Sequence, residues 1–250
     1  MKNALFVTAA VAALAAAAPS FAQSVGSVGA NYTHSEVEIG GFEGEGDIFT
    51  VDGEVAFDVS NAWTVTLDGA VSYDDDAIDD EFGFTGTGAL TYGMGDSRIG
   101  GFLGAAEAAD ETMVGGGLVA ETYMQNVTLS GQVGYGQVDD ADIDLWGLNG
   151  EARYFVSNNF RLDGSLGYVS AESGGVDADG WTAGVGGEYQ LAASPISFTA
   201  GYRHSELNDL DVSEDAFTVG VRYSFGGDLR ARDRAGANVG GLDRLFGGLF

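Results

Sequence analysis

Hydrophobic and polar residues alternate without a break along residues 216–225, AFTVGVRYSF. The apolar and aromatic members of this pattern are Phe217, Val219, Val221, Tyr223 and Phe225. The positions between them are small, polar or charged. Because successive side chains of a β-strand point to opposite faces, this period of two predicts a strand with one apolar face and one polar face.

The same alternation recurs along most of the chain, interrupted by turn residues. It is clear in ten segments, near residues 28–32, 49–57, 63–73, 82–92, 127–135, 146–154, 160–168, 181–189, 196–202 and 216–225. Two further segments, 98–106 and 113–123, are rich in glycine and alanine, and their facing is ambiguous. The pattern predicts an all-β chain of about twelve antiparallel strands connected up and down. Ten strands is the alternative if the two ambiguous segments are not strands.

The connections between these segments alternate in length and charge. Five are short and lie at residues 59–62, 93–97, 124–126, 155–159 and 191–195. Six are longer and acidic, and they lie at residues 34–47, 74–81, 107–111, 138–144, 170–180 and 204–215. The six hold 26 of the 38 carboxylates, so the end of the barrel that carries them is expected to be strongly acidic. Short turns at one end and long outward loops at the other are typical of outer-membrane barrels, and an even strand count then places both termini in the periplasm.

Aromatic residues mark both ends of the predicted strands. Beside the short turns lie Trp63, Tyr92, Tyr123, Tyr154, Phe160, Tyr189 and Phe225. Beside the long loops lie Tyr32, Phe49, Tyr73, Phe82, Tyr135, Trp146, Tyr168, Trp181, Tyr202 and Phe217. Two such girdles around an aliphatic band match the two interfaces of a membrane. The alternative is a soluble barrel of the lipocalin type, in which the apolar face points inward.

With these features the chain resembles bacterial outer-membrane β-barrels, and among them small porin-family proteins, over residues 1–225. The resemblance implies a transmembrane antiparallel up-and-down β-barrel that lies among outer-membrane lipids and lipopolysaccharide. It also implies passive diffusion of small hydrophilic solutes. In such barrels the closing strand and its terminal Phe form the signal that the barrel-insertion machinery reads, which here implies the outward residues of 217–225.

The two ends of the chain differ in composition from the barrel. Lys2, the apolar residues 4–18 and the small-x-small site at 20–22 predict a secretory signal peptide at 1–22, removed after Ala22. An N-terminal anchor helix is the alternative, but the segment is too short to span comfortably. We therefore divide the chain into the signal peptide, a barrel at 23–225 and a periplasmic C-terminal tail at 226–250. The tail holds four arginines and no strand period; we expect a flexible extension, with 242–246, LDRLF, as a docking segment in the alternative.

The net charge limits the partners of the chain. Removal of the signal peptide leaves nine arginines against 38 acidic residues, a net charge of −29 with histidine neutral. Such a chain repels nucleic acid and favours cations. There is no cysteine, so closure of the sheet rather than disulfide bonds must stabilise the exported chain.

The inward faces of the strands supply the first candidate site. Its predicted pore-lining residues are Asp52, Glu54, Asp58, Asp68, Glu151, Arg153, Arg161, Asp163, Glu188, Arg203 and Arg222. The first four form an acidic wall and the four arginines a basic wall, an arrangement that in diffusion porins orients water and selects polar solutes. Together with small polar neighbours they predict a narrow, cation-leaning pore. In the alternative, the charges in the short-turn half pair with one another and plug the lumen.

Two further candidates depend on the loops. The acidic runs 74–80 and 140–144 offer oxygen ligands for divalent cations, but both lack the EF-hand glycine and closing glutamate, which favours solvated loops. Both histidines lie in Tyr-x-His-Ser-Glu segments, and His204 with Ser205 is the only candidate for a lipid hydrolase. Adjacent strand residues point to opposite faces, which disfavours that pair. With two His, no Cys and no GxSxG, P-loop, HExxH or CxxC pattern, we expect no enzyme, no cofactor and no resident metal.

Overall fold

The computed structural model of the chain describes residues 24–74, 81–108, 111–138, 143–208 and 211–246. The predicted signal peptide lies outside these residues, as do most of the connections 74–81 and 138–144 and two residues each of the connections 107–111 and 204–215.

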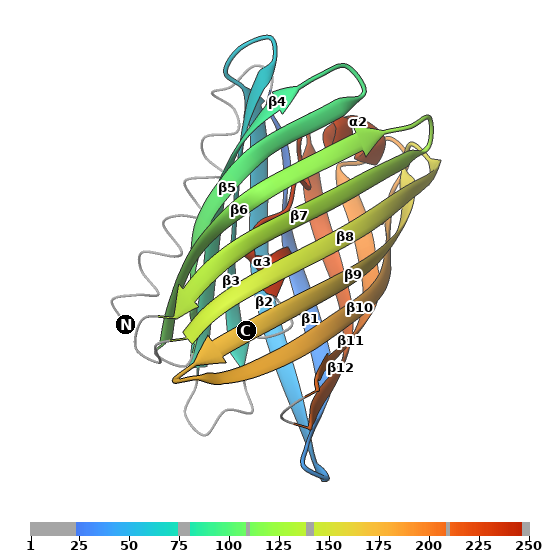
Figure 1. The fold of residues 1–250 in the computed structure, drawn as a ribbon. Helices are drawn as coiled ribbons and strands as arrows, with labels where there is room; N and C mark the ends of the chain where they lie inside the picture. Colours follow the sequence, from blue (N-terminus) through green and yellow to red (C-terminus); the bar gives the residue numbers. More distant parts are fainter. Residues whose placement is uncertain (1–23, 75–80, 109–110, 139–142, 209–210, 247–250) are drawn as a thin grey trace.

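Twelve antiparallel strands form a closed barrel (Figure 1). Their bounds are β1 Val25–Ile39, β2 Phe42–Asp58, β3 Trp63–Asp74, β4 Glu81–Gly93, β5 Ser97–Ala108, β6 Glu111–Tyr123, β7 Val127–Val138, β8 Ile143–Ser157, β9 Phe160–Ser173, β10 Val176–Gln190, β11 Ile196–Leu207 and β12 Val212–Phe225. Each strand pairs with its neighbours in sequence, and β1 pairs with β12. The prediction of an up-and-down barrel of twelve strands is confirmed, and the ambiguous glycine-rich segments are β5 and β6.

The closing strand has the two faces that its sequence predicts. In β12 the side chains of Phe217, Val219, Val221 and Tyr223 are exposed on the outside, while Ser224 is buried. The register joins Gly26 to Phe225 and continues along the whole of both strands to Ile39 and Val212. No edge of the sheet is therefore left open.

Apolar side chains cover the outside of the barrel between two aromatic girdles. At the short-turn end Trp63 packs on Tyr92 with ring centroids 5.1 Å apart, and at the long-loop end Tyr135 packs on Trp146 at 5.2 Å. Tyr123 is an exception to the predicted girdle, because it lies on the inner face and its hydroxyl donates to Glu121. An apolar outer face excludes the lipocalin-type alternative, in which this face would point inward.

Two of the six predicted loops are instead hairpins that extend the barrel at the long-loop end. Residues 34–47 and 170–180 belong almost wholly to β1–β2 and β9–β10, so the expected loops are wrong there. The reason is the glycine pair at each tip: φ is +56° and +86° at Gly40 and Gly41, and +60° and +82° at Gly174 and Gly175. Two central residues with positive φ make the tight turn that continues two strands without a loop.

Residues 226–246 of the C-terminal tail lie within the barrel, not outside it. Its helices are α2, Leu229–Arg234, at the short-turn end, and α3, Leu242–Phe246, near the middle of the lumen (Figure 1). Helix α3 lies against β4, β5, β7, β8 and β9. The expectation of a flexible extension is therefore wrong for residues 226–246. The docking alternative named residues 242–246 only and describes that segment, whereas the docking of α2 was not expected. None of the helices in the described part of the chain is long and apolar enough to cross a membrane.

A core inside the barrel explains this position. The inner faces of β4–β9 and the tail share one apolar cluster, made of Ala89, Phe102, Ala106, Met113, Val119, Val138, Leu145, Val169, Val239, Leu242, Leu245 and Phe246. These side chains would face pore water if the tail were outside. Burial of apolar surface therefore draws α3 into the lumen.

Candidate functional site: a lumen shared with the tail

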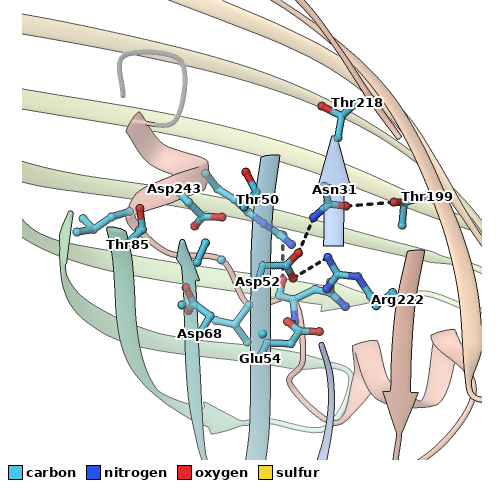
Figure 2. Close-up of a pocket in the computed structure, with 18 of the residues that line it drawn as sticks. Asn31, Thr50, Asp52, Glu54, Asp68, Thr85, Thr199, Thr218, Arg222 and Asp243 are labelled. Carbon is cyan, nitrogen blue, oxygen red and sulfur yellow. Dashed lines mark hydrogen bonds and ion pairs between the residues drawn. The ribbon is translucent and has the colours of Figure 1, made fainter. Parts of the chain in front are cut away.

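A polar cavity of about 500 Å³ occupies one side of the lumen. Its wall comes mainly from the inner faces of β1–β4 and β9–β12, and the tail closes the remaining side (Figure 2). The charged residues around the cavity are Asp52, Glu54, Asp68, Glu188, Asp243, Arg161, Arg203, Arg222 and Arg244. Seven of the predicted pore-lining residues are in this set, and the tail adds Asp243 and Arg244.

Within the cavity wall, opposite charges pair across β1. Arg222 of β12 lies 2.8 Å from Asp52 of β2, and Asp52 accepts a hydrogen bond of 2.6 Å from the Asn31 amide (Figure 2). Arg222 also donates to the hydroxyl of Ser27 at 2.9 Å. The acidic and basic walls therefore meet at this strand, because closure of the barrel places β2 and β12 on either side of β1.

Arg153 is fully buried and holds the tail. Its guanidinium pairs with Asp233 of α2 and with Glu121, and its Nε lies 3.5 Å from Glu151. Asp233 is also fully buried and accepts a hydrogen bond of 2.7 Å from Thr128. Arg153 was predicted to line a pore; in the structure it binds the tail, and a buried ion pair of this kind depends on every partner being present.

Two more arginines of the tail reach the wall. Arg232, 2% exposed, lies 3.3 Å from Glu188, and Arg161 lies 3.6 Å from the same carboxylate. Arg244 lies 2.6 Å from Glu151.

Glycines on the inner wall give α3 its room. A Cβ on Gly147 would lie 2.7 Å from Leu245 Cγ, and a Cβ on Gly134 would lie 2.6 Å from Leu245 Cδ2. Both distances are below van der Waals contact. The helix can therefore approach the wall so closely only because these strands carry no side chain there.

The tail crosses the short-turn end of the lumen from wall to wall. Thr66 of β3 donates to the carbonyl of Gly236 at 2.8 Å, and Arg98 of β5 donates to the carbonyl of Arg234 at 3.1 Å. Further hydrogen bonds of the tail reach β1, β2, β4, β7, β8 and β10. Ala237 and Val239 are buried at 0% and 1% exposure. The contacts therefore form a partition across this end.

The remaining predicted site residues take smaller parts. Asp163 lies 3.0 Å from Arg161, and Asp58 is exposed at the rim, where it accepts a hydrogen bond of 2.7 Å from Thr64. The part of Asp233, Arg232 and Arg244 was missed at the level of sequence. The available signal was the arginine content of the tail, which holds four of the nine arginines of the mature chain. Three carboxylates lie on the inner faces of β6, β8 and β10.

The two histidines form matching clusters at the long-loop end. His34 Nδ1 lies 2.8 Å from Asp47, His204 Nδ1 lies 2.8 Å from Asp215, and the hydroxyls of Tyr32 and Tyr202 donate to the same two carboxylates. Only β12 separates β1 from β11 in the closed barrel. Ser205 is buried on the inner face, whereas its neighbour His204 stacks on Trp181 of the outer face. His204 and Ser205 therefore do not form a pair for hydrolysis.

Within the described residues, no group of three His, Asp or Glu side chains gathers in a way that could hold a metal ion. Most of the acidic runs 74–80 and 140–144 falls outside that part of the chain.

Comparison with known proteins gives one matching family and several similar solved structures. A model of the Gram-negative porin family matches residues 26–232. No match is found among curated proteins. Among solved structures, a NanC porin is similar with a TM-score of 0.57 at 10% identity, covering 78% of this chain and 100% of the other. A KdgM porin in complex with disordered oligogalacturonate has a TM-score of 0.54 at 12% identity, covering 79% and 99%. The translocator domain of the autotransporter NalP from Neisseria meningitidis has a TM-score of 0.52 at 13% identity, covering 90% and 98%.

At these identities the structural likeness establishes the fold alone. The family match ends at residue 232, inside α2, so the rest of the tail, including α3, lies beyond the matched range.

Proposed function

This chain belongs to the Gram-negative porin family, an outer-membrane β-barrel, and from that premise we propose that it passes small hydrophilic solutes by passive diffusion with a preference for cations. The path runs along the polar cavity between β1–β4 and β9–β12. The short-turn end faces the periplasm and the acidic loops face outward, as in other outer-membrane barrels.

The unpaired carboxylates of the cavity carry the cation preference. Each of its four arginines has a carboxylate partner within 3.6 Å. In contrast, Glu54, Asp68 and Asp243 line the cavity and form no ion pair among the described residues (Figure 2). Carboxylates without a cationic partner in a polar channel lower the energy of a passing cation and raise that of an anion.

The outer end of the barrel acts in the same direction. The long connections carry most of the 38 acidic residues of the chain. A strongly acidic mouth increases the local concentration of cations, and this effect weakens as salt screens the charges. We expect the acidic loops to attract divalent cations loosely rather than to bind them at fixed sites.

One observation favours a second candidate, a closed structural or surface-interaction barrel. The tail crosses the short-turn end and is bonded to strands on all sides of it. A barrel closed in this way would serve through its outer surface and loops. Lipid hydrolysis, the third candidate, has no such support, because His204 and Ser205 lie on opposite faces of β11.

Conductance of the mature chain in a planar bilayer tests the proposal. We expect discrete current steps and, in a salt gradient, a reversal potential on the side of the cation. The double variant Asp68→Asn with Asp243→Asn should conduct with lower cation preference. The matched control is Asp58→Asn, at the rim and outside the cavity, which should keep the preference of the parent. Conduction that favours anions would rule out the cation preference.

Assembly is a separate proposal. We infer that residues 1–22 are removed on export and that the insertion machinery reads the outward residues of β12, which end at Phe225. Their exposure on the outside of the closing strand supports this role.

A further inference from the structure

We propose that the C-terminal tail is an autoinhibitory plug that undocks as a unit to open the channel. The inference rests on the proposed function, since it concerns the regulation of that diffusion path. It is carried by four features: specific docking contacts, a glycine hinge, buried donors left without partners, and a barrel that closes without the tail.

The docking contacts are specific. Asp233 and Arg232 enter buried positions on the wall and pair with Arg153 and Glu188. Leu245 fits against Gly134 and Gly147, where any residue with a Cβ would collide with its side chain. Charge pairing at one end and steric fit at the other define a single docked position, as a plug requires.

A pair of glycines joins the tail to the barrel. Gly226 and Gly227 follow the last residue of β12 and have φ of +85° and +148°. Other residues rarely adopt these values, and a Cβ on Gly226 would lie 2.6 Å from the carbonyl oxygen of Ser24. This glycine pair is the tail's covalent link to the barrel, so a change of a few dihedral angles there can swing α2 away from the mouth.

The docked state leaves buried donors unsatisfied. Nε and Nη1 of Arg98 and Nε of Arg232 are buried and find no hydrogen-bond partner among the residues that the structure describes. Arg98 lies beneath the tail, where a Cβ on Gly236 would meet its Nη1. Water reaches these donors once the tail leaves. The unsatisfied donors at the mouth therefore raise the free energy of the docked state, whereas the packing around α3 lowers it. This balance allows the tail to undock and to dock again.

The barrel itself does not need the tail to close. All twelve strand pairings, including β1 with β12, involve residues 25–225 only. Undocking therefore exposes the inner wall of β5–β9 to water without opening the sheet. A twelve-stranded barrel without its plug has a wider lumen than the eight-stranded barrels that side chains just fill.

A reversible disulfide tests the inference directly. The chain has no cysteine, so a designed pair can form only one intramolecular bond. A Cβ on Gly147 would lie 2.7 Å from Leu245 Cγ. One C–C bond separates that Cγ from Leu245 Cβ, so the two Cβ atoms lie at most about 4.2 Å apart, close enough for a disulfide after small side-chain and backbone adjustments. The variant Gly147→Cys with Leu245→Cys should therefore lock α3 to β8 when oxidised.

Single-channel conductance and the swelling of liposomes in a neutral sugar are measured on this variant before and after reduction. We expect oxidation to lower solute flux at least about tenfold and reduction to restore it, since the lock shifts the population wholly to the docked state. Each single-cysteine variant, treated with the same oxidant, is the control and should not change. Equal flux in the oxidised and reduced forms would overturn the inference.

Deletion of residues 226–250 provides the second arm. We expect the shortened barrel to conduct at least about tenfold more than the full chain, because no docked state remains. If the full chain, the deletion and the locked form conduct equally, the plug is wrong and the channel stands. If the deletion inserts as a folded barrel and is silent, the proposed channel itself fails. A deletion that does not fold leaves the decision to the disulfide variant.

Discussion

The two sides of the barrel have similar apolar outer faces but differ in the chemistry of their inner faces. Strands β1–β4 and β10–β12, the open half, turn mostly threonine, serine and charged residues inward around the cavity. Strands β5–β9, the filled half, turn inward glycines and apolar residues such as Phe102, Met113 and Leu145, which pack on the tail. Contact with lipid requires an apolar outer face on every strand, whereas the inner face of a strand depends on whether it contacts the tail or the cavity.

The difference locates stability and selectivity in different places. In the filled half, buried ion pairs and close packing hold the tail, so substitutions there should change stability and docking. In the open half, most of the cavity charges are partly hydrated, the buried Glu188 being the exception, so substitutions of the hydrated charges should change ion preference more than stability. Four predictions test this division, beginning with the largest expected effect.

Removal of the buried arginine should cost the most. Arg153→Ala leaves Glu121, Glu151 and Asp233 buried around an empty position, and we expect it to destabilise the folded chain by about 3–5 kcal/mol. The measurement is denaturant unfolding in detergent micelles. The control, Arg203→Ala in the open half, removes a partly exposed pair with Glu214 and should cost less than about 1 kcal/mol. Similar losses for the two variants would contradict the division into halves.

A single methyl group should distinguish the filled face from its own reverse side. Gly147→Ala places a Cβ against Leu245, and we expect it to weaken docking of α3 by about 1–3 kcal/mol, because the packed side chains must move. The readout is the rate at which a protease cuts the tail. Gly150→Ala lies on the same strand with nothing within 4 Å of its Cβ, so this control should be cut at the parent rate. Equal rates would mean that α3 does not depend on the glycines.

A charge change in the open half should act on selectivity with little effect on stability. We expect the double variant Asp68→Asn with Asp243→Asn to lower the ratio of cation to anion permeability about threefold, because both residues line the cavity without an ion pair among the described residues. The reversal potential in a salt gradient gives this ratio. Asn149, buried on the inner face of the filled half, supplies the comparison: Asn149→Ser should leave the ratio unchanged. A larger shift from the second variant would reverse the assignment of the path.

The smallest effect is expected on assembly. A chain that ends at Phe225 keeps every strand pairing and the exposed aromatic face of β12, so it should insert into the outer membrane as efficiently as the full chain. Membrane fractionation measures this, with Phe225→Ala in the shortened chain as the variant that should lower insertion. Loss of insertion on truncation alone would place the assembly signal in the tail.

Much of the outer face followed from local pattern, and the exceptions are instructive. Residues 98–106 and 113–123 were ambiguous because both of their faces are small or apolar: Leu103 faces lipid, while Phe102 and Val119 face the tail. The long connection at 34–47 was mistaken for a loop because acidic residues outside the membrane do not need to alternate with apolar ones. In the first case the tail inside the barrel, and in the second the water outside the membrane, removes the contrast between alternate positions. The sequence alone reveals neither environment.

The sequence by itself determined an up-and-down barrel of about twelve strands, the outward faces of ten of them and most of the aromatic girdles, because each depends on the period of two and on contact with lipid. Only the tertiary structure decided what the inward charges do. Asp52 meets Arg222 because the barrel closes at β1, and Arg153 meets Asp233 because the chain turns back at Gly226 and enters its own lumen. Such pairings join residues far apart in sequence and depend on closure and on volume inside the barrel, which no local pattern encodes.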